Sequence, residues 1–129
     1  MKLTWPSRRV VLLSLAALAV PGALGGYAAV STALRCAAQG RSGGALASVG
    51  AAYLAAIPEE RDRRVLIARL RAETPTVLEA LAKGGMDAAL TEARQTLATG
   101  SATVACGGWV LGQAEARCAA LVALERDAA

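Results

Sequence analysis

Residues 102–121 read ATVACGGWVLGQAEARCAAL, and this stretch predicts the C-terminal part of the fold. From 102 to 106 the side chains alternate with a period of two, which is typical of a strand. Gly107-Gly108 can adopt the positive φ values of a tight two-residue turn, so residues 109–111 can return as a second strand. A lone hairpin is not stable in water, and we therefore expect this hairpin to pack on helices.

The same stretch predicts where the last helix begins. Gly112 is an acceptable N-cap, and Glu115 then falls at the third helical position, where its carboxylate can accept the N–H of the cap residue. The helical pattern continues to about Arg126. Its expected apolar side chains are Cys118, Leu121, Val122 and Leu124.

Helical patterns also fill the chain upstream of the hairpin. Apolar residues recur at helical spacing, and Gly, Pro and Thr residues separate the segments. The segments that we expect to be helical are 44–57, 58–73, 75–83 and 87–98, which with the C-terminal helix make five, and residues 28–38 can extend as a helix up to Gln39-Gly40. The sequence therefore predicts a mainly α fold of four or five short helices, with a small β-hairpin before the C-terminal helix. We expect residues 28–129 to form a single small domain.

The net charge of +4 suggests an anionic partner, but the distribution of the charges argues otherwise. Lys2, Arg8 and Arg9 precede an apolar run, and without them 11 basic residues face 10 acidic ones, a balance of +1. The arginines of 61–71 are interleaved with acidic residues, as on a solvated helix face. No basic stripe with aromatic residues is present, so we predict no nucleic-acid partner.

The sequence contains no histidine, which excludes His-based catalytic triads, His acid–base catalysis and His-containing zinc sites. Cys36, Cys106 and Cys118 form no Cys-x-x-Cys motif, so we expect neither a redox pair nor a clustered metal site. They are either small buried apolar residues or, in an oxidising compartment, include a disulfide that would most plausibly join Cys106 to Cys118. We therefore predict no catalytic, cofactor-binding or metal-binding residues and no enzymatic activity.

The N-terminus has the layout of an export signal. Residues 10–34 carry no charge, and the most apolar part, 10–20, spans 11 residues, whereas a helix needs about 20 to cross a bilayer. Basic residues, a short apolar core and the Pro21-Gly22 break predict a signal peptide over 1–25, with its end between 25 and 33. The alternative is a retained anchor through 10–34.

The paired arginines indicate the export route. Ser7, Arg8, Arg9 and Leu12 match the Ser/Thr-Arg-Arg-x-Phe-Leu-Lys pattern, so the segment resembles a twin-arginine signal. Val11 stands in place of the usual Phe, and an ordinary secretory signal is the alternative. The resemblance implies that the twin-arginine export machinery is a partner.

The C-terminal stretch resembles a recurrent ending of small exported bacterial proteins that carry a twin-arginine-type signal. The residues that match this ending are Gly108, Trp109, Val110, Leu111, Glu115, Ala116, Arg117 and Leu121. This group has no assigned biochemical function, so the resemblance implies location and architecture rather than chemistry. Two interpretations of the motif remain. Trp109 either fills a helical core while Glu115 and Arg117 decorate a helix start, or the three residues form a docking surface.

These observations predict an exported, non-catalytic accessory or protein-interaction protein of the bacterial cell envelope, with one protein partner. Its expected location is the periplasm, or the inner membrane if the segment 10–34 is retained as an anchor. The alternative is a small escort subunit of a periplasmic flavin-dependent sugar or alcohol dehydrogenase. Such subunits are similar in having a leader, helices and a Trp-containing segment near the C-terminus.

Overall fold

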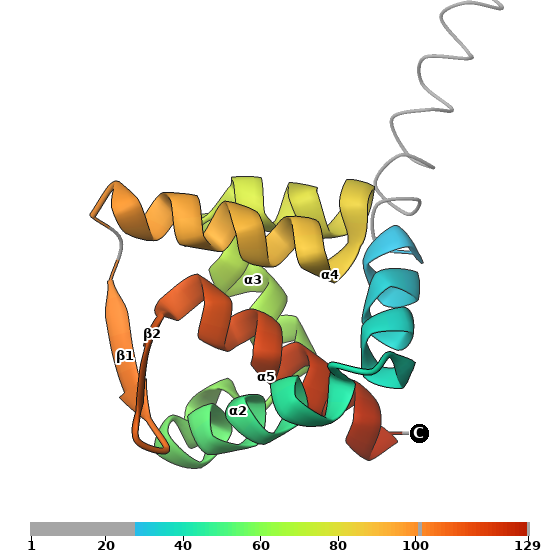
Figure 1. Ribbon diagram of the computed structural model, residues 1–129, viewed down its shortest axis with the longest axis horizontal. Helices are drawn as coiled ribbons and strands as arrows, with labels where there is room; N and C mark the ends of the chain where they lie inside the picture. Colours follow the sequence, from blue (N-terminus) through green and yellow to red (C-terminus); the bar gives the residue numbers. More distant parts are fainter. Residues whose placement is uncertain (1–27, 101, 129) are drawn as a thin grey trace, which may run out of the picture.

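A computed structural model describes residues 28–100 and 102–128. The predicted export signal, with Ser7, Arg8, Arg9 and Leu12, lies outside the described residues. The elements are a helix over 28–39, α2 (Gly43–Ala56), a 3₁₀ turn η1 (Pro58–Glu60), α3 (Arg63–Glu73), α4 (Pro75–Ala98), β1 (Thr103–Cys106), β2 (Trp109–Gly112) and α5 (Gln113–Ala128). The predicted mainly α fold, with a hairpin before the last helix, is confirmed (Figure 1).

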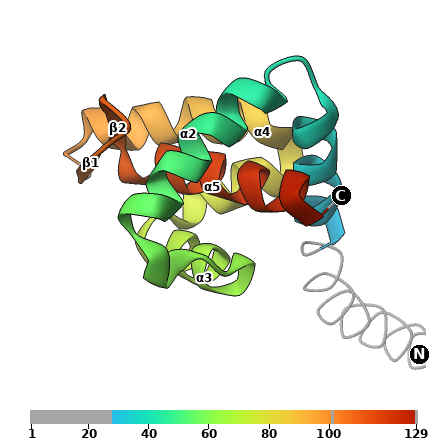
Figure 2. The same cartoon turned by 90° about the horizontal axis from the view of Figure 1, so that it is seen from below.

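Helix α5 is the central element of the fold. It crosses the middle of the molecule, with α2, α3 and α4 arranged around it (Figures 1 and 2). Every residue from Ala116 to Ala123 is buried. A helix that is buried all round carries no single apolar stripe, and α5 accordingly draws contacts from α2, α3, α4 and the hairpin.

Small residues allow α2 to lie directly on α5. A Cβ atom added to Gly50 in α2 would stand 2.0 Å from the backbone carbonyl oxygen of Ala119 in α5. No side chain fits at that distance, so the two backbones are in contact at this crossing. Leu54 and Tyr53 flank the crossing as buried neighbours on α2.

The hairpin has the geometry that its glycines predict. Cys106 pairs with Trp109 across the turn, and Gly107 and Gly108 have φ values of 56° and 84°. Two successive positive φ values are the signature of a two-residue turn that matches the right-handed twist of the strands. The backbone N–H of Gln113 donates to the carbonyl of Ala102 at 2.9 Å, which extends the ladder into the start of α5.

Two helix boundaries differ from the prediction. The segment 58–73 is not one helix, because Asp62 caps a helix that starts at Arg63; its side chain accepts from the backbone N–H of Arg64 at 2.7 Å. The preceding residues form η1 instead. The segments 75–83 and 87–98 join into α4, and the predicted break survives as a kink at Gly85, whose φ is 82°. None of the described helices is long and apolar enough to cross a membrane.

Candidate functional site

Trp109 lies at the hairpin tip with 62% of its surface exposed, so the interpretation that it fills the helical core is wrong. The register explains why. Trp109 is the first residue after the turn and shares a face of the hairpin with its partner Cys106. Cys106 is buried against the helices, whereas the tip extends far enough to leave the indole in solvent. Val110, on the opposite face, is 72% exposed.

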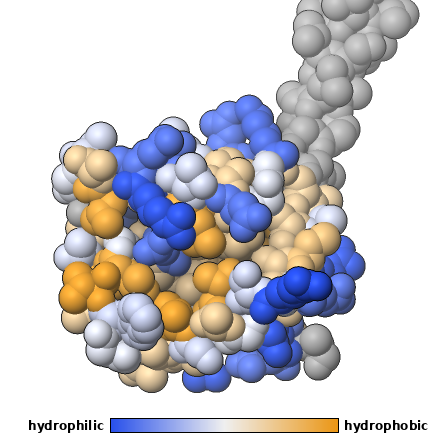
Figure 3. All heavy atoms as spheres, in the orientation of Figure 1, coloured by the Kyte–Doolittle hydropathy of each residue, from blue (hydrophilic) through white to orange (hydrophobic). Residues whose placement is uncertain are grey.

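Beside Trp109 is a shallow apolar hollow of about 270 Å³, which we call the Trp109 groove. Side chains from α2, α4, β2 and α5 form its walls. On the face of the molecule shown in Figure 3, hydrophobic side chains gather on the side of the hairpin, whereas hydrophilic side chains lie over α4 and around the C-terminal end of α5. The groove is lined by Ala45, Leu46, Val49, Leu90, Arg94, Trp109, Leu111, Glu115 and Ala119.

An ion pair forms one rim of the Trp109 groove. Nε of Arg94 lies 3.2 Å from Oε2 of Glu115, which joins α4 to the first turn of α5. The Arg94 side chain is mostly exposed, so the pair adds little to stability and its guanidinium can reach other groups. Glu115 therefore lies on the rim of the Trp109 groove, close to Trp109. Arg94 is a second rim residue, which the sequence pattern did not indicate.

Arg117 does not belong to this surface, so the prediction that it helps to form a docking surface is wrong. Its side chain is only 3% exposed. Nε and Nη2 lie 2.9 and 3.3 Å from the two carboxylate oxygens of Glu60, and Nη1 lies 2.9 Å from Oε2 of Glu73. The side chain points inward because two carboxylates, on η1 and at the end of α3, meet it there. A buried guanidinium requires such partners.

Tyr53 completes this buried cluster. Its hydroxyl donates to Oε1 of Glu60 at 2.9 Å. Burial acts to raise the pKa of the Glu60 carboxyl, but the hydrogen bonds from Arg117 and Tyr53 outweigh it and hold that pKa below its usual range. Burial and the bond to Glu60 raise the pKa of Tyr53. The cluster ties α2, η1, α3 and α5 together, and we interpret it as the support that holds α5 in register beneath the groove.

Two of the three cysteines follow the first of the predicted alternatives, and for Cys36 the predicted burial is wrong. Cys106 and Cys118 are buried free thiols rather than a disulfide, and Cys36 is a free thiol on the surface. Burial raises the pKa of the Cys118 thiol to about 12, so it carries almost no thiolate at neutral pH. Cys118 acts as a small apolar side chain in the core of α5.

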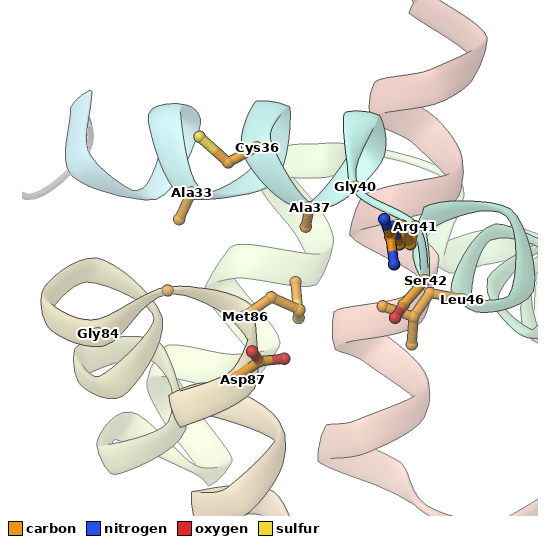
Figure 4. Close-up of a pocket in the computed structure, with 11 residues that line it drawn as sticks. Ala33, Cys36, Ala37, Gly40, Arg41, Ser42, Leu46, Gly84, Met86 and Asp87 are labelled. Carbon is orange, nitrogen blue, oxygen red and sulfur yellow. The ribbon is translucent and has the colours of Figure 1, made fainter.

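A second hollow, of about 450 Å³, separates the 28–39 helix from the kink of α4. Figure 4 shows Ala33 and Ala37 facing Met86 across it. Among the described residues that line it, the charged side chains are Arg41 and Asp87, one of each sign. This balance does not distinguish an anion from a cation, so the Trp109 groove is the better-defined site.

The described residues contain no group of three or more Cys, Asp or Glu side chains placed to hold a metal ion. Chemically, the Trp109 groove offers an indole, aliphatic walls and one accessible guanidinium. Such a surface has the chemistry to accept apolar side chains that are flanked by an acidic or carbonyl group. Comparisons of the chain with protein-family models, with curated proteins and with solved structures found no match.

Proposed function

We propose that this protein is an exported, non-catalytic interaction protein of the bacterial cell envelope, and that it holds a protein partner on the Trp109 groove. The exposed indole of Trp109 beside an apolar hollow is the observation that carries the proposal. Tryptophan is enriched among the residues that dominate binding energy in interfaces, and burying one removes a large apolar surface from water. Arg94 supplies a charged contact at the rim.

The surroundings of the groove support a protein partner. Helix α2 carries no charged residue over its 14 positions, and neither does the hairpin. Charged residues are depleted at the centres of protein interfaces, and this face has that composition. The charged side chains lie instead on η1, α3, α4 and α5, and three of the five on α5 are in its last turn.

The proposal is tested by site-specific photocrosslinking in the bacterium. A photoreactive amino acid at Arg94 should give a discrete adduct with one partner, and the same residue at Glu79, which is exposed outside the groove lining, should not. Replacing Trp109 by Ala should abolish the adduct, whereas the matched change Val110→Ala, one position further on β2, should leave it intact. No adduct at Arg94, or an adduct that survives W109A, contradicts the proposal. A flavoprotein in the adduct would identify the escort-subunit alternative.

The export step is tested separately. Replacing both Arg8 and Arg9 by Lys should retain the protein in the cytoplasm if it uses the twin-arginine route. Export of this variant at the normal rate would show that the protein does not use the twin-arginine route. N-terminal sequencing of the exported protein would distinguish a cleaved signal from a retained anchor.

A further inference from the structure

The outer edge of β1 is an open hydrogen-bonding edge. In the described part of the chain the sheet has only two strands, and β1 pairs with β2 alone. The carbonyl of Ala102 accepts from Gln113 across the hairpin, so the even-numbered residues of β1 direct their backbone groups toward β2. The N–H and C=O groups of Thr103 and Ala105 therefore point away from β2, toward the other edge.

This edge lacks most of the features that usually protect an exposed strand. Natural edge strands carry charged side chains, prolines or bulges, which prevent pairing with another chain. Residues 102–112 contain no charged residue and no proline, and the ladder from Thr103 to Cys106 runs without a bulge. Short length is the remaining protection. The hairpin also lies at one end of the molecule in both views, with β1 outermost in Figure 1.

We infer that β1 pairs with the β1 strand of a second copy of this chain. The spacing of the open groups is self-complementary: in an antiparallel pair centred on Val104, Thr103 of each copy faces Ala105 of the other. Each of these two facing pairs can exchange two backbone hydrogen bonds, and the result is a continuous four-stranded sheet. A two-fold axis at Val104 makes the contact closed, so it yields a dimer and not a fibre.

The charge distribution favours a second copy over another partner. An uncharged strand selects neither an acidic nor a basic peptide, and two identical uncharged edges meet without repulsion. The described residues carry 11 basic and 10 acidic side chains, so the copies approach with little net repulsion. Because the Trp109 groove lies on the β2 side of the hairpin and the open edge on the β1 side, the dimer does not depend on the proposed function.

The dimer is tested by sedimentation equilibrium of the full chain in a non-ionic detergent over a wide range of concentrations. We expect a monomer–dimer equilibrium for the natural sequence. Ala105→Pro removes an outward N–H that the hairpin does not use, and should weaken the dimer at least about tenfold, since two hydrogen bonds are lost per dimer. Val110→Lys, at the cross-strand partner of Ala105 on β2, is the matched control and should leave the dimer intact. A monomer at every concentration, an open-ended series of larger species, or an A105P dimer of unchanged affinity would each overturn the inference.

Two further variants complete the test. If A105P fails to fold, as judged by its circular dichroism, Ala105→Lys leaves the backbone donor in place but puts two like charges at diagonal positions on one face of the four-stranded sheet, about 7–8 Å apart. A weaker dimer then supports the inference and an unchanged dimer refutes it. Trp109→Ala should keep the dimer while losing the photocrosslinked partner, which separates failure of the dimer from failure of the proposed function.

Discussion

Replacing Glu60 by Gln should destabilise the domain far more than the same change at Glu73, although both carboxylates bind Arg117. Glu60 is buried and meets the guanidinium through two hydrogen bonds, at 2.9 and 3.3 Å. A Gln at this position keeps the shape but offers the guanidinium one acceptor and one unsuitable donor. Removing one partner of a buried ion pair costs about 3–5 kcal/mol, and we expect the lower end because one hydrogen bond can survive.

Glu73 is the matched control, because its side chain is 45% exposed and solvent screens its attraction to Arg117. Its replacement by Gln should cost roughly 1 kcal/mol or less. For a domain of this size, each kcal/mol lowers the melting temperature by about 4–8 °C, so E60Q should lower it by roughly 12–24 °C. Urea and thermal unfolding, followed by far-ultraviolet circular dichroism, measure both variants. If E60Q lies within about 1 kcal/mol of E73Q, the buried pair does not hold the fold as argued.

The same pair predicts how stability depends on pH. The pKa of Glu60 is lower in the folded chain than its ordinary value of 4.5. The folded state therefore binds fewer protons than the unfolded state at acidic pH. The contribution of Glu60 is fully present above the unfolded pKa and is lost as the pH falls from about 5 through the folded pKa. Urea unfolding between pH 3 and 7 should show this loss in the natural sequence and a shallower dependence in E60Q. Identical slopes would contradict the assignment.

Three further predictions concern packing and exposure. Gly50→Ala should cost at least about 2 kcal/mol because its Cβ would overlap the Ala119 carbonyl, whereas Gly44→Ala in the same helix, with its nearest neighbour at 3.6 Å, should be neutral or stabilising; urea midpoints compare the two. In the native protein a thiol reagent at pH 8 should modify Cys36 rapidly and Cys118 only after unfolding, as measured by peptide mass spectrometry. Trp109→Ala should change the free energy of unfolding by less than about 1 kcal/mol, because the indole is largely exposed. A larger loss of stability would indicate that the indole is packed in the core.

The elements whose formation depends on residues close together in the sequence could be predicted. Gly107 and Gly108 between alternating residues require a tight turn, and the turn decides the register of the hairpin. The buried residues Leu66, Ile67 and Leu70 follow from helical spacing alone. Local patterns do not decide the helix start in 58–73, because Pro58 and Asp62 are both favourable there; the structure has a 3₁₀ turn at Pro58 and the α-helix after Asp62.

Local sequence patterns do not predict which residues of the candidate site are buried and which are exposed. Hydrophobicity alone would place Trp109 in the core and Arg117 in solvent. In the structure Trp109 is exposed and Arg117 is buried. Glu60 lies 57 positions from Arg117 in the sequence, and no local spacing relates them. Gly50 gives no hydrophobic signal in the sequence because it has no side chain, although an added Cβ atom would lie 2.0 Å from the carbonyl oxygen of Ala119 in α5.

The sequence by itself determined the helices, the hairpin and the breaks between them, because those features follow from backbone preferences and from the period of apolar residues over a few turns. Only the tertiary structure decided which charged residue is buried and which aromatic residue is exposed. Burial of a charge depends on whether distant partners can neutralise it, and Glu60 and Glu73 do so for Arg117 only once η1, α3 and α5 have packed. Exposure of Trp109 depends on how far the hairpin extends past the helices, which is settled when Cys106 packs into the core.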